Sequence, residues 1–118
     1  MSKAKNFVNI GGQLRPVAFD HWCFYIWSKT VNKPLEALIY AGSLNFWELM
    51  ELIRSGLYNG TVVEGKPIEI SSQQVCNWLS ERPEAQGEIL EIFFESSTRL
   101  WGEPDKGELD PESEKSSQ

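Results

Sequence analysis

The stretch NFWELMELIRSGLYNG, which begins at Asn45, decides the fold. Its apolar side chains recur every three or four residues, the spacing of one face of an α-helix. Asn45 predicts an N-cap, and Glu48 three residues later completes a capping-box pattern. The pair Asn59-Gly60 predicts a left-handed stop. We therefore expect an amphipathic helix over residues 45–58, with a buried stripe of Phe46, Leu49, Met50, Ile53 and Leu57.

Two more helices are predicted before this one. The first covers residues 19–30, because Phe19, Trp22, Cys23, Ile26 and Trp27 form one helical stripe. Phe24 and Tyr25 lie off that stripe, so this helix is apolar on more than one face. Pro34 predicts the start of a short second helix that ends near Ala41. Its inner face would be Leu35, Leu38 and Ile39.

Two helices are predicted after the central stretch. Residues 61–70 form a connector, with a short extended stretch at its start. The pattern Ser71-x-x-Gln74 is a capping box, and it predicts a helix with Val75, Trp78 and Leu79 facing inward. Pro83 ends that helix and begins the last one, which continues to about Trp101.

A β-hairpin is predicted over residues 7–17, where two β-prone runs flank Gly11-Gly12. A two-residue turn would pair Ile10 with Gln13. A three-residue turn would pair Ile10 with Leu14 and gather Val8, Ile10 and Leu14 on one face. The second register is preferred because it keeps the apolar residues together.

The length and composition fit one domain. The chain has 118 residues, of which 41% are hydrophobic and 24% charged. We expect a flexible N-terminus over residues 1–6, a globular domain over residues 7–101 and a disordered acidic tail over residues 102–118. The predicted fold class is α+β, mainly α, with a short N-terminal hairpin followed by about five helices.

The charge distribution argues against a nucleic-acid-binding protein. The net charge is −6, and residues 103–118 hold six of the seventeen acids. The last helix would present Glu84, Glu88, Glu91 and Glu95 along one face, which would repel phosphates. A solvated helix face is the simpler interpretation of that stripe, and steering of a basic partner is the alternative.

No stretch predicts a membrane span or an export signal. The longest apolar run has about six residues, against the roughly 20 that cross a bilayer. The N-terminus lacks the pattern of a secretory signal. We therefore expect a cytoplasmic protein whose two cysteines, Cys23 and Cys76, stay reduced.

The sequence offers no catalytic or metal-binding pattern. The single histidine, His21, is two residues from Cys23, and a helix points these side chains apart. His21 is therefore expected at the surface or at a cap, and Cys76 as a small buried hydrophobe. No cysteine or histidine spacing suits a metal, and the Gly-Gly turn lacks the features of a phosphate loop. We expect a protein that is not an enzyme and that uses no cofactor or metal.

The last helix carries two apolar sets, whose centres lie roughly 115° apart at 100° per residue. One is Ile89, Ile92, Phe93, Ser96 and Leu100, and the other is Leu90, Phe94 and Trp101. Either the helix is central and both sets are buried, or one set faces a partner. The candidate residues for partner or self contact are Phe24, Tyr25, Leu90, Phe94 and Trp101.

Several segments together resemble the phage tail assembly chaperones, small proteins of tailed phages and prophages. They are NIGGQLRPVAF from Asn9, PLEAL from Pro34, FWELMELIRSGL from Phe46, VCNWL from Val75 and FFES from Phe93. The resemblance spans about residues 7–97, and the Gly-Gly hairpin followed by Arg-Pro is its most telling part. The acidic tail departs from the pattern that we can match.

The resemblance implies a non-enzymatic role. Such chaperones hold the long tape measure protein until the tail tube polymerises, and they usually leave before the virion matures. It therefore implies a protein of the bacterial host cytoplasm that binds helical segments of the tape measure protein. No catalytic or ligand residues carry over. The alternatives are a structural tail or head–tail connector subunit, or a small regulator that binds a host protein. The same features also suit a homo-oligomer.

Overall fold

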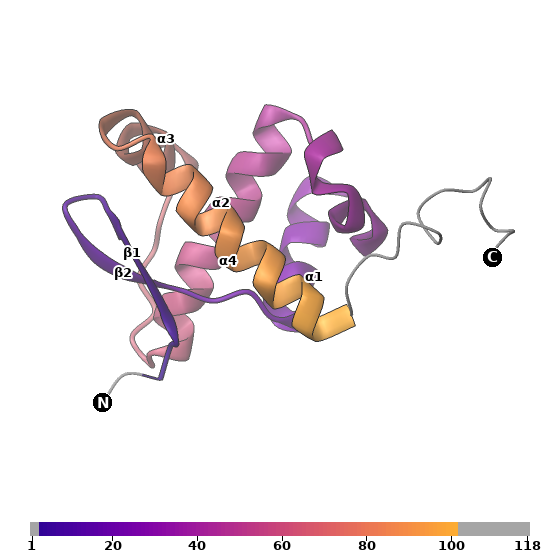
Figure 1. Cartoon of the computed structure of the whole chain (residues 1–118), viewed down its shortest axis with the longest axis horizontal. Coiled ribbons are helices and arrows are strands. Elements are labelled where there is room, and N and C mark those ends of the chain that lie inside the picture. Colours follow the sequence, from indigo (N-terminus) through magenta and orange to yellow (C-terminus); the bar gives the residue numbers. More distant parts are fainter. Residues whose placement is uncertain (1–2, 102–118) are drawn as a thin grey trace, which may run out of the picture.

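The computed structural model describes residues 3–101, apart from the side chains of residues 40–42 and Trp101. It is mainly helical, with an N-terminal antiparallel hairpin of two strands (Figure 1). The elements are β1 (Asn6–Ile10), β2 (Gln13–Val17), α1 (His21–Val31), the 3-10 segment η1 (Leu35–Ser43), α2 (Phe46–Val63), α3 (Ser72–Glu81) and α4 (Glu84–Trp101).

The described residues contain four α-helices, and the prediction of about five was wrong. The segment expected as a helix from Pro34 to Ala41 is in 3-10 form as η1. Of the three residues predicted on its inner face, Leu38 is buried, whereas Leu35 and Ile39 are exposed. A 3-10 helix repeats every three residues, so the spacing of four between Leu35 and Ile39 does not give one common inner face.

The helix α2 is the centre of the molecule. It packs against α1, β2, α3 and α4, and residues on all sides of it are buried. Its capping box at Asn45 and Glu48 forms as predicted. The stop predicted at Asn59-Gly60 was wrong, because the helix continues to Val63 and therefore includes the residues expected as a short extended stretch.

Close packing of the hairpin explains why α2 continues past Gly60. A Cβ atom on Gly60 would lie 2.1 Å from the carbonyl oxygen of Pro16. The side chain of Asn59 donates a hydrogen bond to the carbonyl oxygen of Ala18 at 3.1 Å. Gly60 therefore packs against β2 and Asn59 binds the residue after it, and the left-handed residue comes later, at Gly65.

The hairpin has the two-residue turn and not the preferred three-residue turn. Ile10 pairs with Gln13 and Val8 with Arg15. Gly11 and Gly12 both have positive φ angles, which suit a tight turn of this length. Leu14 was expected on the inner face, but it is 68% exposed.

Arg15 takes the inner position instead of Leu14. Its guanidinium lies 4.2 Å from the centre of the Trp78 ring, and its Nε donates to the carbonyl oxygen of Ile10 at 2.8 Å. A long cationic side chain can thus cover an aromatic ring beside a buried strand face. The alternation of apolar residues alone could not predict this exchange.

The N-terminal segment is ordered further toward its start than expected. Ala4 is buried, and its backbone N–H donates to the carboxylate of Glu64 at the end of α2. Residues 1–2 and the predicted acidic tail, residues 102–118, lie outside the described residues.

The remaining two helices match their predicted starts. The capping box of Ser71 and Gln74 opens α3, and Val75 and Leu79 are buried. On α4, the first predicted apolar set faces the core, since Ile89 and Phe93 are fully buried and Ser96 nearly so. Phe93 meets the ring of Phe19 edge to face, which joins α4 to the start of α1.

Candidate protein-binding surface

An exposed aromatic cluster lies on the outer side of α1. Trp22 is 57% exposed and Tyr25 is 48% exposed. Their rings stack at 5.6 Å between centroids, and the Lys29 ammonium lies 5.8 Å from the centre of the Tyr25 ring. We refer to Trp22, Tyr25 and Lys29 as the α1 outer face. It combines one cation with two large aromatic rings, and Trp and Tyr are residue types that are frequent at protein interfaces.

The orientation of α1 accounts for this exposure. The fully buried residues of α1 are Cys23, Phe24 and Trp27, so the helix is turned by roughly 75° from the predicted stripe at 100° per residue. The indole N–H of Trp27 donates to the carbonyl oxygen of Glu48 at 3.0 Å, which fixes α1 against the start of α2. Trp22, which was predicted to be buried, therefore faces outward.

A hollow of about 410 Å³ lies beside α1 and η1. His21, Leu35, Glu36 and Ile39 line it. Leu35 and Ile39 are partly exposed here, so the hollow offers apolar surface with a histidine and a carboxylate at its rim. His21 is at the surface, as expected, at the first residue of α1.

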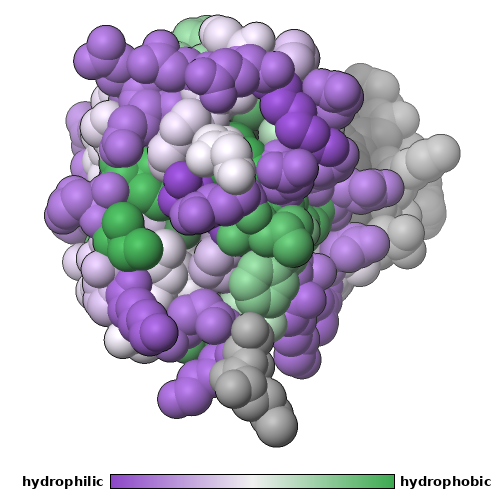
Figure 2. All heavy atoms as spheres, turned by 90° about the vertical axis from the view of Figure 1, so that its left-hand side faces the viewer, coloured by the Kyte–Doolittle hydropathy of each residue, from purple (hydrophilic) through white to green (hydrophobic). Residues whose placement is uncertain are grey.

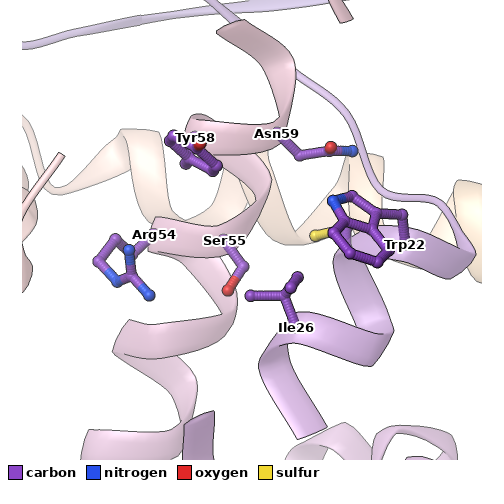
Figure 3. A pocket seen from close by; sticks show the side chains of 7 residues that line it. Trp22, Ile26, Arg54, Ser55, Tyr58 and Asn59 are labelled. Carbon is purple, nitrogen blue, oxygen red and sulfur yellow. The ribbon is translucent and has the colours of Figure 1, made fainter. Parts of the chain in front are cut away.

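A second, much smaller cavity separates α1 from α2 (Figure 3). Its volume is about 20 Å³, which is room for about one water molecule. Trp22 and Ile26 line it from α1, and Ser55 and Tyr58 line it from α2. Within the described part of the chain, the Ser55 hydroxyl is buried without a hydrogen-bond partner. The cavity is too small for a substrate or a cofactor.

Cys23 also lines this cavity, and it is almost fully buried. Burial raises the pKa of the Cys23 thiol far above its ordinary value, so the thiol stays protonated at neutral pH. Cys23 and Cys76 are both free thiols.

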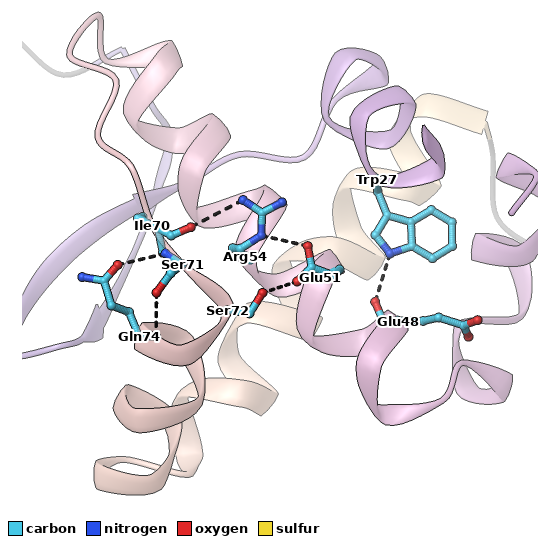
Figure 4. A network of polar contacts seen from close by, with 8 residues as sticks. All are labelled: Trp27, Glu48, Glu51, Arg54, Ile70, Ser71, Ser72 and Gln74. Carbon is cyan, nitrogen blue, oxygen red and sulfur yellow. Dashed lines mark hydrogen bonds and ion pairs between the residues drawn. The ribbon is translucent and has the colours of Figure 1, made fainter. Parts of the chain in front are cut away.

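The buried carboxylates on α2 join elements of the fold (Figure 4). Glu51 accepts hydrogen bonds from Arg54 Nε at 2.9 Å and from the hydroxyl of Ser72 at the start of α3. Arg54 also donates to the carbonyl oxygen of Ile70 at 3.4 Å. These contacts occupy the polar atoms between α2 and α3, so this network supports the packing of the two helices.

Glu48 forms a second link between elements, at the first turn of α2. Lys33 Nζ lies 2.7 Å from its carboxylate, and this hydrogen bond lowers the pKa of Glu48, with a further contribution from the backbone N–H of Asn45.

In residues 3–101, no group of three or more acidic, histidine or cysteine side chains could hold a metal ion. The same residues include no helix with the length and apolarity of a transmembrane span.

The five predicted partner-binding residues differ in how far they are exposed. Phe24 was a wrong choice, because it is fully buried and its ring lies 6.2 Å from that of Phe19 and 5.9 Å from that of Phe93. Tyr25 is exposed on the α1 outer face. On α4, Leu90 is half-buried and Phe94 is 53% exposed. The side chain of Trp101 lies outside the described part.

Tyr25 and Phe94 belong to separate ring contacts. Tyr25 stacks on Trp22, whereas Phe94 lies 5.2 Å from the buried ring of Phe93.

On the acidic stripe of α4, Glu88 binds Arg82 at 2.7 Å, and the other three glutamates are exposed. The simpler interpretation of that stripe, a solvated helix face, is thus adequate for Glu84, Glu91 and Glu95.

The exposure of several apolar residues was not predicted from the sequence. Trp22 and Phe46 fit the predicted buried stripes, but both are exposed, as are Trp47, Leu35 and Ile39. Phe46 is the first residue of α2, so it extends beyond the elements that cover the rest of its stripe. The unusually high aromatic content, 12%, was the one signal that more rings exist than the core can bury.

The side of the molecule that carries the hairpin and α3 is largely polar. Figure 2 views the molecule from the side of the hairpin and α3, and polar residues cover most of that face. Hydrophobic residues come to this surface only in separate places (Figure 2). The α1 outer face, with two stacked rings and the neighbouring hollow, is therefore the better candidate for a binding surface.

No family model, curated protein or solved structure matches this chain.

Proposed function

We propose that this protein is a tail assembly chaperone of a phage or prophage, which binds the tape measure protein through protein–protein contacts and catalyses no reaction. The proposal begins from the resemblance of residues 7–97 to that family. The single structural observation that supports it best is the α1 outer face. Two stacked, half-exposed rings on α1, the helix whose first residue, His21, lines an apolar hollow, are suited to an apolar helical segment of a partner.

The chemistry of the surface fits such a segment. Leu35 and Ile39 give the hollow aliphatic walls, and His21 and Glu36 add polar groups to its lining. A partner helix could bury apolar residues at helical spacing here while its polar residues stay at the rim.

The test is co-expression with the protein of the longest helical reading frame encoded just downstream, which the proposal identifies with the tape measure protein. We expect a long, otherwise insoluble protein to become soluble and to copurify with the chaperone. Truncation of the tape measure protein would then locate the bound segment. A chaperone that stays alone while the tape measure protein precipitates would contradict the proposal.

The structural-subunit alternative has its own readout. A chaperone in this role should be absent from purified virions, whereas a tail or connector subunit should be present in stoichiometric amount. Mass spectrometry of purified particles separates the two roles. Detection of this chain in mature particles at a fixed ratio to the tube protein would contradict the chaperone proposal.

A further inference from the structure

A pocket on another side of the molecule gathers cations in a protein that is acidic overall. It lies where the N-terminal segment, the end of β2 and the last turns of α4 meet, and its volume is about 220 Å³. Lys3, Lys5 and Arg99 all line it, together with Ser96. We refer to Lys3, Lys5, Arg99 and Ser96 as the cationic pocket.

These three cations are distinguished by their lack of partners. Residues 3–101 contain nine lysines and arginines, and five of them have an ion pair or lie over an aromatic ring. Of the four described cations without such a contact, three line this one pocket, and Lys66 is the fourth. Such a concentration of unpaired positive charge favours a negatively charged occupant.

The pocket also contains one acid, which is already engaged. Asp20 lines it, but its carboxylate accepts the backbone N–H of Cys23 at 2.9 Å as the N-cap of α1. Among the residues that line the pocket, the excess of positive charge is therefore two, and the carboxylate of Glu64 beside it is engaged by the backbone N–H of Ala4. Carboxylates of a peptide could be accommodated beside the lysines and the guanidinium of Arg99.

We propose that the acidic segment of this chain from Glu103 to Glu114 docks into the cationic pocket. Six carboxylates lie in these 12 residues, at Glu103, Asp105, Glu108, Asp110, Glu112 and Glu114. The charge of the segment is thus opposite to that of the pocket. This proposal does not depend on the proposed chaperone function.

The connection of the segment to α4 favours docking within one molecule. Glu103 follows Arg99 by only four residues. An extended chain covers about 3.3–3.6 Å per residue, so the segment can reach across the pocket from the end of α4. A short covalent connection gives an effective concentration in the millimolar range, which makes even weak ionic contacts populated.

The test uses the full chain labelled with ¹⁵N. The tail variant is Asp105→Asn with Glu108→Gln and Asp110→Asn. Its matched control removes three carboxylates from α4, by Glu84→Gln, Glu91→Gln and Glu95→Gln. We expect the amide signals of Lys3, Lys5 and Arg99 to shift in the tail variant and to stay in place in the control.

Salt and a reciprocal variant complete the test. Ionic contacts weaken as the Debye length shrinks, so about 0.5 M NaCl should shift the same signals in the unaltered chain. The variant Lys3→Gln with Lys5→Gln should shift signals of residues 103–114. Pocket signals that respond neither to the tail variant nor to salt would overturn the proposal. Shifts that vanish on dilution would also overturn it, because they would assign the contact to a second copy.

Discussion

Phe24 and Tyr25 are neighbours in the sequence of α1, yet they meet opposite environments. The ring of Phe24 contacts those of Phe19 and Phe93 and is fully buried. Tyr25 stacks on Trp22 and is half exposed. Both are large aromatic residues on one helix, so residue type does not separate them. The difference is that α4 and α2 cover the inner side of α1, whereas no described element covers the outer side.

The aromatic residues on the two sides of α1 have two different roles. The inner rings contribute to the free energy of unfolding, and we expect the outer rings to contribute to binding. Substitutions on the two sides should therefore change different measured quantities.

The largest expected effect is on the inner side. Phe24→Ala should lower the free energy of unfolding by about 3–5 kcal/mol, because it removes a buried ring and leaves a cavity. Tyr25→Ala should cost less than about 1 kcal/mol, since its ring is already half solvated. Urea denaturation followed by circular dichroism would measure both. Equal losses for the two variants would break the comparison.

A glycine substitution tests the close packing of α2 against β2. Gly60→Ala should cost about 1–3 kcal/mol, because the new methyl group would collide with the backbone of Pro16. Gly87→Ala on α4 is the matched control, since a Cβ there meets nothing within 4 Å. We expect that control to stabilise the helix by up to about 1 kcal/mol. A stabilised Gly60→Ala variant would show that β2 and α2 are less closely packed.

Acid should weaken the ionic links between elements. Hydrogen bonds from Lys33 and Arg82 lower the pKa values of Glu48 and Glu88 below the ordinary 4.5. The unfolded chain therefore takes up these protons first as the pH falls, so stability is lost from about pH 4.5 downward. Thermal unfolding between pH 3 and pH 6 would measure this loss. In the Glu48→Gln variant the dependence should be shallower, and an unchanged slope would contradict the assignment.

The smallest effect on stability is expected on the outer side. Trp22→Ser with Tyr25→Ser should change the free energy of unfolding by under about 1 kcal/mol, because substitutions at exposed positions usually have small effects. Thermal denaturation and near-ultraviolet circular dichroism would confirm an intact core. A strongly destabilised double variant would place these rings among the structural residues.

Much of the fold was predictable from local signals. The capping boxes at Asn45 and Ser71 and the break at Pro83 depend on residues close in sequence, so the starts of α2, α3 and α4 were predicted correctly. The helix predicted from Phe19 begins at His21, after Asp20 as its N-cap. The end of α2 was not predicted correctly, because Asn59 and Gly60 serve contact with the chain near Pro16, some forty residues earlier. Local propensity carries no information on such a distant neighbour.

The predictions of the hairpin register and of the orientation of α1 were wrong for a similar reason. Arg15 replaces Leu14 on the inner face because Trp78 of α3 offers a ring for it to cover. Phe24 faces inward because Phe93 of α4 lies there. The candidate site depends on the same tertiary choice, so the sequence identified Tyr25 correctly as exposed but missed its neighbour Trp22.

The most direct test of the account is a pull-down with the α1 outer face altered. The unaltered chain, the Trp22→Ser with Tyr25→Ser variant and a Leu14→Ser control would each be co-expressed with the tape measure protein. Leu14 is an exposed apolar residue on the hairpin, so its loss controls for reduced surface hydrophobicity. We predict that only the double variant loses the partner while staying folded. Full binding by that folded double variant would contradict the assignment of this surface.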